Sequence, residues 1–163
     1  MRLPSDPRQY IVGVLVAAVV VFAAYSFGSV PGPVSGVGLP TSFSVDGRTF
    51  SITYAATTPS QRALGLMGAR VTSTTTMLFV FPSPGYYSFW MFGTNTSLDM
   101  VWISATGSSG TVVYLVQDAA SCRLPALFCA RYTPSAEANY VLEAKAGFAA
   151  ANGITVGTTI SFS

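Results

Sequence analysis

The chain has 163 residues, of which 50% are hydrophobic and only 9% are charged, against roughly 25% charged residues in ordinary soluble domains. This length accommodates one compact domain plus an attached segment, and a net charge of +2 without any run of basic residues argues against a nucleic-acid partner. The chain contains no histidine, so it lacks the commonest general base and zinc ligand. We therefore expect no catalytic residues, no metal and no cofactor.

The first predicted element is an apolar segment, residues 10–27 (YIVGVLVAAVVVFAAYSF), which carries no charge. At about 1.5 Å per residue these eighteen residues reach roughly 27 Å, and residues 28–30 extend them to the thickness of a bilayer core. We predict a transmembrane helix over residues 10–30 that contacts membrane lipid. The alternative is a signal peptide, in which Val21 and Ala23 would occupy the positions before the cleavage site. The apolar run, however, exceeds the roughly 7–15 residues of a signal core.

The charges around this segment predict its orientation. Arg2 and Arg8 precede it, and the next charges are Asp46 and Arg48. By the positive-inside rule, residues 1–9 are cytoplasmic and the remainder is periplasmic or extracellular. Residues 31–40 are rich in Gly and Pro and are predicted to be a linker. Residues 41–163 would then form an extracytoplasmic domain.

From residue 41 onward the pattern is typical of strands separated by turns. Asp46-Gly47 lies between two β-rich runs and is the strongest short-range hairpin signal. Thr58 and Gln61 form a capping box that begins a short helix over residues 58–68, and a second short helix is predicted over 146–153. The predicted strands are 41–45, 48–54, 75–81, 86–92, 98–104, 111–117, 139–145 and 158–162.

These elements predict an α+β, mainly β fold. We expect a compact antiparallel or mixed β-sheet, or a barrel-like domain, with two or three short helices, preceded by the single transmembrane helix. The two cysteines, Cys122 and Cys129, bracket the sequence CRLPALFC. Two thiols without histidine cannot complete a four-ligand zinc site. A disulfide is therefore predicted, which agrees with a location outside the cytoplasm.

Several segments, in this order, resemble the family known as domain of unknown function 192. They are QRALGLMGAR, TTMLFVFPSPGYYSFWMFGTNTSLDMVWIS, CRLPALFCARY, ANYVLEAKAGFAAANGI and VGTTI, between about Phe50 and Ile160. The resemblance implies a compact, mainly β domain with a few short helices, often secreted or membrane-tethered. It implies a fold more than a function.

The resemblance also marks individual positions. Where the family usually has Lys-Asn after its Phe-Trp-Met pattern, this chain has Phe92 and Gly93. Where the family usually has a proline, this chain has Ser97. If that Lys and Asn belong to a polar site, the site is lost here, which favours a surface that faces a partner or lipid. The positions that match the family's motifs are Arg62, Gly65, Met67, Arg70, Trp90, Thr94 and Asp99.

The aromatic run beginning at Phe89 is predicted to have two apolar faces. Phe89 and Met91 share one face of the expected strand, and Trp90 and Phe92 share the other. Because both faces need cover, we assign the first to the core and take Trp90 and Phe92 as candidates for interaction. Cover from within the domain is favoured for Trp90.

Three further polar positions have functional alternatives. Asp99 is either a general base or a buried acceptor of backbone N–H groups or of an ion pair with Arg62 or Arg70, and the structural role is favoured. Asp118 is predicted to be a turn residue, and Glu143 is predicted to face solvent. Asn95-Thr96-Ser97 matches the acceptor pattern for N-glycosylation.

Together these features predict a non-catalytic, single-pass membrane protein. Its outer domain would be an accessory or stabilising subunit of a larger membrane complex, for example a respiratory or photosynthetic one. One alternative is an extracytoplasmic small-ligand-binding protein, or an enzyme of unknown reaction, that uses Arg62, Arg70 and Asp99 around Trp90. Another is a self-assembling surface or filament subunit that pairs through exposed strand edges.

Overall fold

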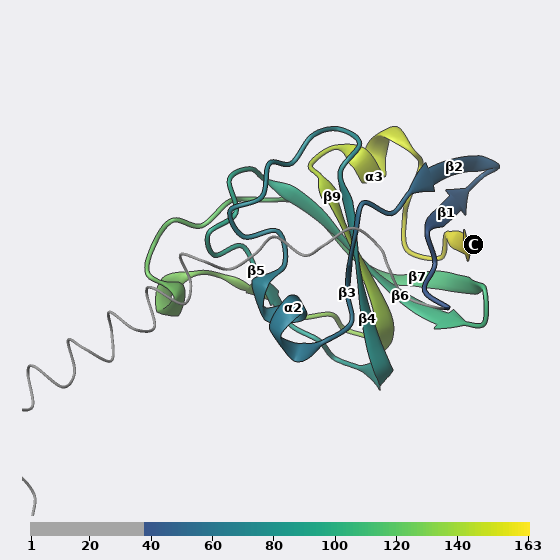
Figure 1. Cartoon of the computed structure of the whole chain (residues 1–163), viewed down its shortest axis with the longest axis horizontal. Coiled ribbons are helices and arrows are strands. Elements are labelled where there is room, and N and C mark those ends of the chain that lie inside the picture. Colours follow the sequence, from purple (N-terminus) through teal and green to yellow (C-terminus); the bar gives the residue numbers. More distant parts are fainter. Residues whose placement is uncertain (1–37) are drawn as a thin grey trace, which may run out of the picture.

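The computed structural model describes residues 38–163. The predicted cytoplasmic segment 1–9, the predicted span 10–30 and most of the predicted linker 31–40 lie outside the described residues. Within residues 38–163, no helix has the length and apolar character needed to cross a membrane. These residues form a strongly curved sheet with two short α-helices beside it (Figure 1).

Eight strands form one sheet in the order β2-β1-β10-β7-β6-β9-β4-β3, and β5 pairs separately with β8. The pair of β3 and β4 is parallel, and the other strand pairs are antiparallel. This arrangement confirms the predicted α+β, mainly β class. The elements are β1 (Ser42–Val45), β2 (Arg48–Ser51), β3 (Tyr54–Ala56), α2 (Pro59–Leu64), β4 (Thr76–Gly85), β5 (Phe89–Trp90), β6 (Leu98–Thr106), β7 (Ser109–Ala119), the 3-10 helix η1 (Ala126–Phe128), β8 (Arg131–Tyr132), β9 (Ala138–Lys145), α3 (Phe148–Ala151) and β10 (Thr159–Phe162).

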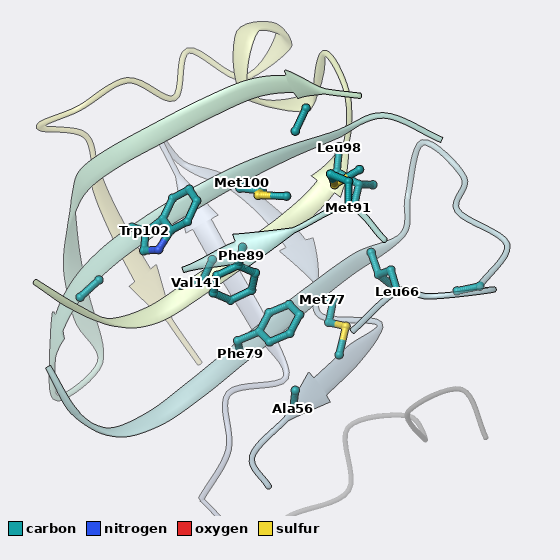
Figure 2. Close-up of a cluster of buried hydrophobic side chains, with 13 residues drawn as sticks. Ala56, Leu66, Met77, Phe79, Phe89, Met91, Leu98, Met100, Trp102 and Val141 are labelled. Carbon is teal, nitrogen blue, oxygen red and sulfur yellow. The ribbon is translucent and has the colours of Figure 1, made fainter. Parts of the chain in front are cut away.

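The central strands bury both of their faces, because each face packs against a separate hydrophobic cluster. On β6, Met100 and Trp102 belong to one cluster, and Val101 and Ile103 belong to the other. This division follows the alternation of side chains along a strand. Figure 2 shows the first cluster, in which β5 and the turn after α2 cover the sheet. We call this side of the sheet the β5 face, and the side that packs against α3 the α3 face.

Local signals explain the elements that begin the domain. Asp46 and Gly47 have φ values of 47° and 76°, and positive φ at both central residues is what a two-residue hairpin turn of this kind requires. At α2, the backbone N–H of Gln61 donates to Thr58 Oγ1, and Gln61 Oε1 accepts from the N–H of Thr58. The predicted hairpin and capping box are therefore both confirmed.

Three predicted boundaries were wrong. The helix ends at Leu64 rather than at Gly68, because Gly65 adopts φ 52° and the chain turns away from the helix. The predicted strand 48–54 is two strands, β2 beside β1 and β3 beside β4, at opposite edges of the sheet. The predicted strand 86–92 is reduced to the two residues of β5 and a single bridge between Phe92 and Cys122.

Candidate functional site

Two carboxylic acids are buried in the sheet, and they lie on opposite faces. Asp99 is 0% exposed and Glu143 is 3% exposed. Met100 of β6 lies directly opposite Glu143 of β9, so Glu143 shares the β5 face with Met100. Asp99, one residue earlier on β6, points to the α3 face. The two acids therefore belong to separate environments.

Asp99 is a structural acceptor. Its Oδ1 accepts from the backbone N–H of Asp118 at 2.9 Å, and its Oδ2 accepts from the N–H of Ala149 at 2.8 Å. The N-cap of α3 is Gly147, which has no side chain to bond the first N–H groups of the helix, and Asp99 supplies the missing acceptor from a strand. These contacts confirm the predicted role as a buried acceptor of backbone N–H groups. Neither Arg62 nor Arg70 is its partner.

Glu143 does not face solvent, so that prediction was wrong. Strand β9 lies between β4 and β6 in the middle of the sheet, and both of its faces are covered at this position. Burial raises the pKa of Glu143 from 4.5 to about 8, which favours the neutral acid at pH 7. Its Oε2 atom has no hydrogen-bond partner among the described residues. Buried polar atoms in native proteins rarely lack a partner, so this atom requires an explanation.

A small cavity of about 20 Å³ lies beside Glu143 on the β5 face. Its lining residues come from α2 and the turn after it, from β4, β5 and β9, and from Phe92 and Thr94. A Cβ atom placed on Gly65 would lie 3.4 Å from Cζ of Phe79 and 4.0 Å from Oε2 of Glu143. Glycine at position 65 therefore leaves space next to the carboxyl group. The family-motif residues that line the cavity are Arg62, Gly65, Trp90 and Thr94.

The remaining family-motif positions lie elsewhere. Arg70 is exposed and Asp99 is on the α3 face, so the predicted grouping of Arg62, Arg70 and Asp99 around Trp90 was wrong. Met67 packs against the chain at Gly93, where an added Cβ would lie 2.6 Å from Met67 Cγ. The turn after α2 is thereby held against the segment that follows β5.

Arg62 connects α2 to the sheet. Its Nη1 donates to the backbone carbonyls of Thr57, at 2.6 Å, and Val80, at 2.9 Å. The guanidinium carbon also lies 5.0 Å from the centre of the Phe81 ring, within the range of a cation–π contact. Arg62 therefore positions one wall of the cavity.

The aromatic run divides as its alternation predicted. Phe89 and Met91 are buried in the core, at 8% and 1% exposure, which confirms the predicted face. Trp90 and Phe92 are half-buried, with their ring centres 5.6 Å apart, and both line the cavity. The guanidinium of Arg131, on β8, lies 4.8 Å from the centre of the Trp90 ring. Part of the cover for Trp90 thus comes from within the domain.

The segment after β5 is shaped by its backbone. Gly93 has φ 68°, a left-handed conformation that glycine and asparagine tolerate best. An added Cβ here would lie 2.6 Å from Met67 Cγ, so glycine is favoured at this position both by its backbone conformation and by its lack of a side chain. Thr94 is buried, and its hydroxyl donates to the carbonyl of Met91 at 2.8 Å. Asn95 is exposed, as a glycosylation acceptor has to be.

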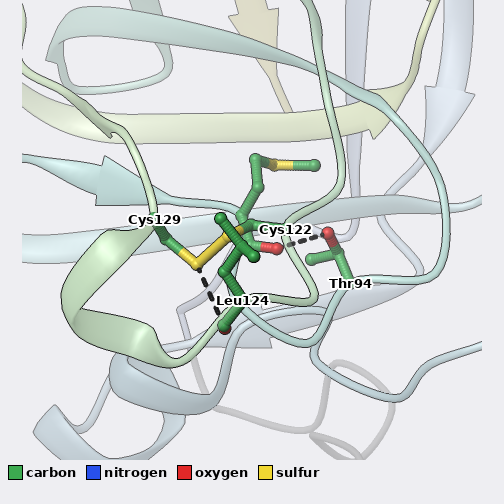
Figure 3. The surroundings of a disulfide bond; sticks show 5 residues. Thr94, Cys122, Leu124 and Cys129 are labelled. Atoms are coloured by element: carbon green, nitrogen blue, oxygen red, sulfur yellow. Dashed lines mark hydrogen bonds between the residues drawn. A yellow bond between two sulfur atoms is a disulfide. The ribbon is translucent and has the colours of Figure 1, made fainter.

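The predicted disulfide between Cys122 and Cys129 is present, with an S–S distance of 2.04 Å (Figure 3). Backbone hydrogen bonds anchor the start of this loop beside the cavity: the N–H of Cys122 donates to Met91 O, and the N–H of Gly93 donates to Cys122 O, each at 3.0 Å. We call residues 122–129 the disulfide loop. It lies at the periphery of the domain, on the side away from the C-terminus (Figure 1).

The disulfide loop exposes large apolar side chains. Leu124, Leu127 and Phe128 are 58%, 87% and 68% exposed. The sequence predicts Trp90 and Phe92 as interaction residues, and that prediction does not include this loop. The signal that could have found the loop is its composition, because only one charge, Arg123, accompanies these three apolar residues between the cysteines.

These observations define a class of protein: a curved, mainly β domain with a carboxyl group buried beside a small cavity and a disulfide-closed loop at its edge. The chain belongs to the domain of unknown function 192 family, described as an uncharacterized ACR, whose family model matches residues 41–162. This match confirms the family resemblance.

Two solved structures are similar to this chain. One is described as a "putative transcription regulator" from Sinorhizobium meliloti 1021, with 29% identity, a TM-score of 0.62, and coverage of 74% of this chain and 90% of that one. The other is a protein of unknown function from Novosphingobium aromaticivorans DSM 12444, with 23% identity and a TM-score of 0.64, covering 82% and 94%. The second likeness concerns the fold alone. No curated protein matches the chain.

Proposed function

We propose that this protein is a non-catalytic, single-pass accessory subunit of a larger membrane complex. Residues 10–30 would hold it in the membrane, and the β-rich domain would contact its partner outside the cytoplasm. The observation that carries this proposal is the exposure of Leu124, Leu127 and Phe128 on the disulfide loop. Contiguous exposed apolar side chains commonly mark interaction sites.

The loop is suited to docking because its conformation is constrained before binding. The disulfide closes it, its first residue is hydrogen-bonded to the segment after β5, and Leu127 and Phe128 lie on the single turn η1. A preorganised loop loses less conformational entropy when it binds. Complete burial of one leucine or phenylalanine side chain contributes roughly 1.5–3 kcal/mol, so a partner that encloses this loop would gain several kcal/mol.

The charge distribution favours a protein partner. Residues 38–163 contain six basic and five acidic residues, whereas binding to anionic lipid or to nucleic acid requires clustered basic residues. We therefore propose an apolar recess on another subunit as the binding site for the disulfide loop. The name transcription regulator belongs to the Sinorhizobium relative and does not enter this proposal.

The test is co-migration of the tagged full chain with a complex after membranes are solubilised in mild detergent and separated on a native gel. We expect the wild type to co-migrate with one stoichiometric assembly, and we expect Leu127→Ser and Phe128→Ser to migrate without it. Val156→Ser is the matched control, because Val156 is also apolar and 62% exposed but lies outside the loop. It should co-migrate like the wild type.

Migration of the wild type without a complex would overturn the proposal, as would retention of the complex by both loop variants. A ladder of homo-oligomers would favour the self-assembling alternative, and loop-dependent binding to protein-free vesicles would favour a lipid surface. Thermal unfolding of each variant should show a melting temperature close to that of the wild type, because these side chains have few contacts to lose.

A further inference from the structure

A pocket of about 640 Å³ lies between strand β2 and helix α3 (Figure 1). Its lining residues come from β2, from the loop before β4 and the first residue of β4, and from the segment 145–152. The volume is within the range of roughly 300–1,000 Å³ that is typical of small-molecule sites. The pocket is separate from the cavity beside Glu143, because the two have no lining residue in common.

The charged residues that line this pocket are Arg48 and Lys145, and both are positive. Both are exposed, so a ligand that enters from solvent can reach them. Within residues 38–163, no acidic side chain lines the pocket. The nearby Asp99 lines a neighbouring pocket, and its two carboxylate oxygens already accept backbone N–H groups. Positive charge without a balancing acid in a pocket attracts anions.

The strand register directs Arg48 toward this pocket. Arg48 lies opposite Val45 of β1, and residues paired in this way share one face of a sheet. Val45 belongs to the hydrophobic cluster on the α3 face, so Arg48 points to the same face. Its Nη1 donates a long hydrogen bond, of 3.4 Å, to the carbonyl of Ala151 on α3. A guanidinium group has five N–H donors, so this one bond leaves others for a ligand.

Two aromatic rings form an apolar wall beside this guanidinium. The guanidinium carbon of Arg48 lies 5.7 Å from the centre of the Phe50 ring, and the ring centres of Phe50 and Phe148 are 5.1 Å apart. Both rings line the pocket and are half-buried, so each keeps apolar surface that a ligand can cover. Phe43, at 0% exposure, packs against both rings and holds them in place.

From this geometry we propose that the pocket is a binding site for a small organic carboxylate. Its carboxylate group binds Arg48, and its apolar body packs against Phe50 and Phe148. The planar fork of a guanidinium group matches the two oxygens of a carboxylate, and removal of apolar surface from water favours binding of the body. This inference goes beyond the proposed function, because the pocket does not include the disulfide loop.

The test is fluorine NMR of three fluorinated ligands mixed with the full chain in mild detergent, with protein-free micelles as the background. The ligands are 4-fluorobenzoate, 4-fluorobenzamide and 4-fluorobenzamidine, which have nearly the same shape but are negative, neutral and positive. We expect saturable broadening of the fluorobenzoate signal, with a dissociation constant of about 1 mM or below. Fluorobenzamide should bind about tenfold more weakly, and fluorobenzamidine should not bind. Added sodium chloride should weaken fluorobenzoate binding, because salt screens exposed charges.

Arg48→Gln is the decisive variant, and we expect it to weaken fluorobenzoate binding by about tenfold, since a charge-assisted hydrogen bond is lost. Arg48→Lys should have an intermediate affinity, because it keeps the charge but not the planar fork. Arg70→Gln is the matched control, because Arg70 is an exposed arginine outside the pocket. It should bind like the wild type. Leu127→Ser should also bind like the wild type, which separates this test from that of the proposed function.

Equal affinities of the wild type for fluorobenzoate and fluorobenzamide would overturn the proposal, as would the absence of saturable fluorobenzoate binding up to about 10 mM. Unchanged fluorobenzoate binding by Arg48→Gln would overturn it too, because the anion would then be held elsewhere. Arg48 is exposed and its side chain donates one long hydrogen bond, so Arg48→Gln is expected to fold, and its melting temperature provides the check. The comparison of the three ligands tests the proposal on the wild type alone.

Discussion

Glu143 lowers the stability of the domain as the pH rises. Its folded-state pKa is about 8 and its ordinary value is 4.5. Below pH 4.5 both the folded and the unfolded chain hold the proton, so this group has no effect. Between pH 4.5 and 8 the unfolded chain releases the proton while the folded chain retains it, which favours unfolding. Above pH 8 Glu143 is ionised in both the folded and the unfolded chain, and the unfolding free energy does not fall further through this group.

This linkage predicts that Glu143→Gln flattens the pH dependence of stability. Over pH 5 to 8 the wild type should lose up to roughly 1.4 kcal/mol of unfolding free energy per pH unit more than the variant. The measurement is urea unfolding of the full chain in detergent at several pH values. Glu137→Gln should follow the wild type, and parallel profiles for wild type and Glu143→Gln would contradict the prediction.

The two buried acids show why one was predicted and the other was not. Asp99 lies between Leu98 and Met100, and its apolar neighbours on both sides predicted burial. Glu143 lies between Leu142 and Ala144, an equally apolar context, but the sequence predicts it to face solvent, as Glu side chains mostly do. Its burial depends on β9 being a central strand covered by β5, which the local sequence does not specify.

Asp99 joins three elements that are distant in the chain. From β6 it accepts the N–H of Asp118 on β7 and the N–H of Ala149 on α3. Asp118 has φ 51° and lies next to the register shift between β6 and β7. The carboxylate thus accepts one hydrogen bond from the backbone of an irregular strand position and another from the start of a short helix.

We predict that Asp99→Ala destabilises the domain by roughly 3 kcal/mol, because the buried N–H of Ala149 and the part-buried N–H of Asp118 both lose a charged acceptor. Asp99→Asn should cost less, since its amide oxygen can still accept one bond. Urea unfolding measures both effects, with Glu137→Ala as the exposed control. A loss for Asp99→Ala no larger than that of the control would show that these bonds contribute little.

The elements on the β5 face form a connected unit around the cavity. Arg62 fixes α2 to β4, Met67 packs over Gly93, and the disulfide loop is bonded to Met91 and Gly93. Three segments matched by the family motifs therefore meet at one place. Their sequence separation is large, so their convergence follows from the sheet order rather than from any local pattern.

The proposed membrane attachment makes a prediction about the complete chain. Retention of residues 1–30 as an anchor predicts that the membrane-extracted protein still contains these residues, with both cysteines oxidised. It should also resist extraction by alkaline carbonate. Intact-mass spectrometry under non-reducing conditions gives the first two results, and thiol labelling before and after reduction checks the disulfide.

Two results would contradict this prediction. A mass that corresponds to cleavage near Ala23 would show that the apolar segment is a signal peptide. Two free thiols in the native protein would remove the support that the disulfide gives to a location outside the cytoplasm.

The sequence by itself determined the Asp46-Gly47 hairpin, the capping box at Thr58, the cysteine pair, the family and the mainly β class. The hairpin and the capping box arise from backbone preferences and contacts a few residues apart, and the β class arises from the pattern of side chains along each strand. The family is indicated by the order of several motifs along the chain. Only the tertiary structure decided that residues 48–54 divide between two sheet edges, that Glu143 is buried beside Gly65 and Thr94, and that Leu127 and Phe128 remain exposed. Burial at these positions depends on segments far away in the chain, because the order of strands in the sheet selects which faces are covered.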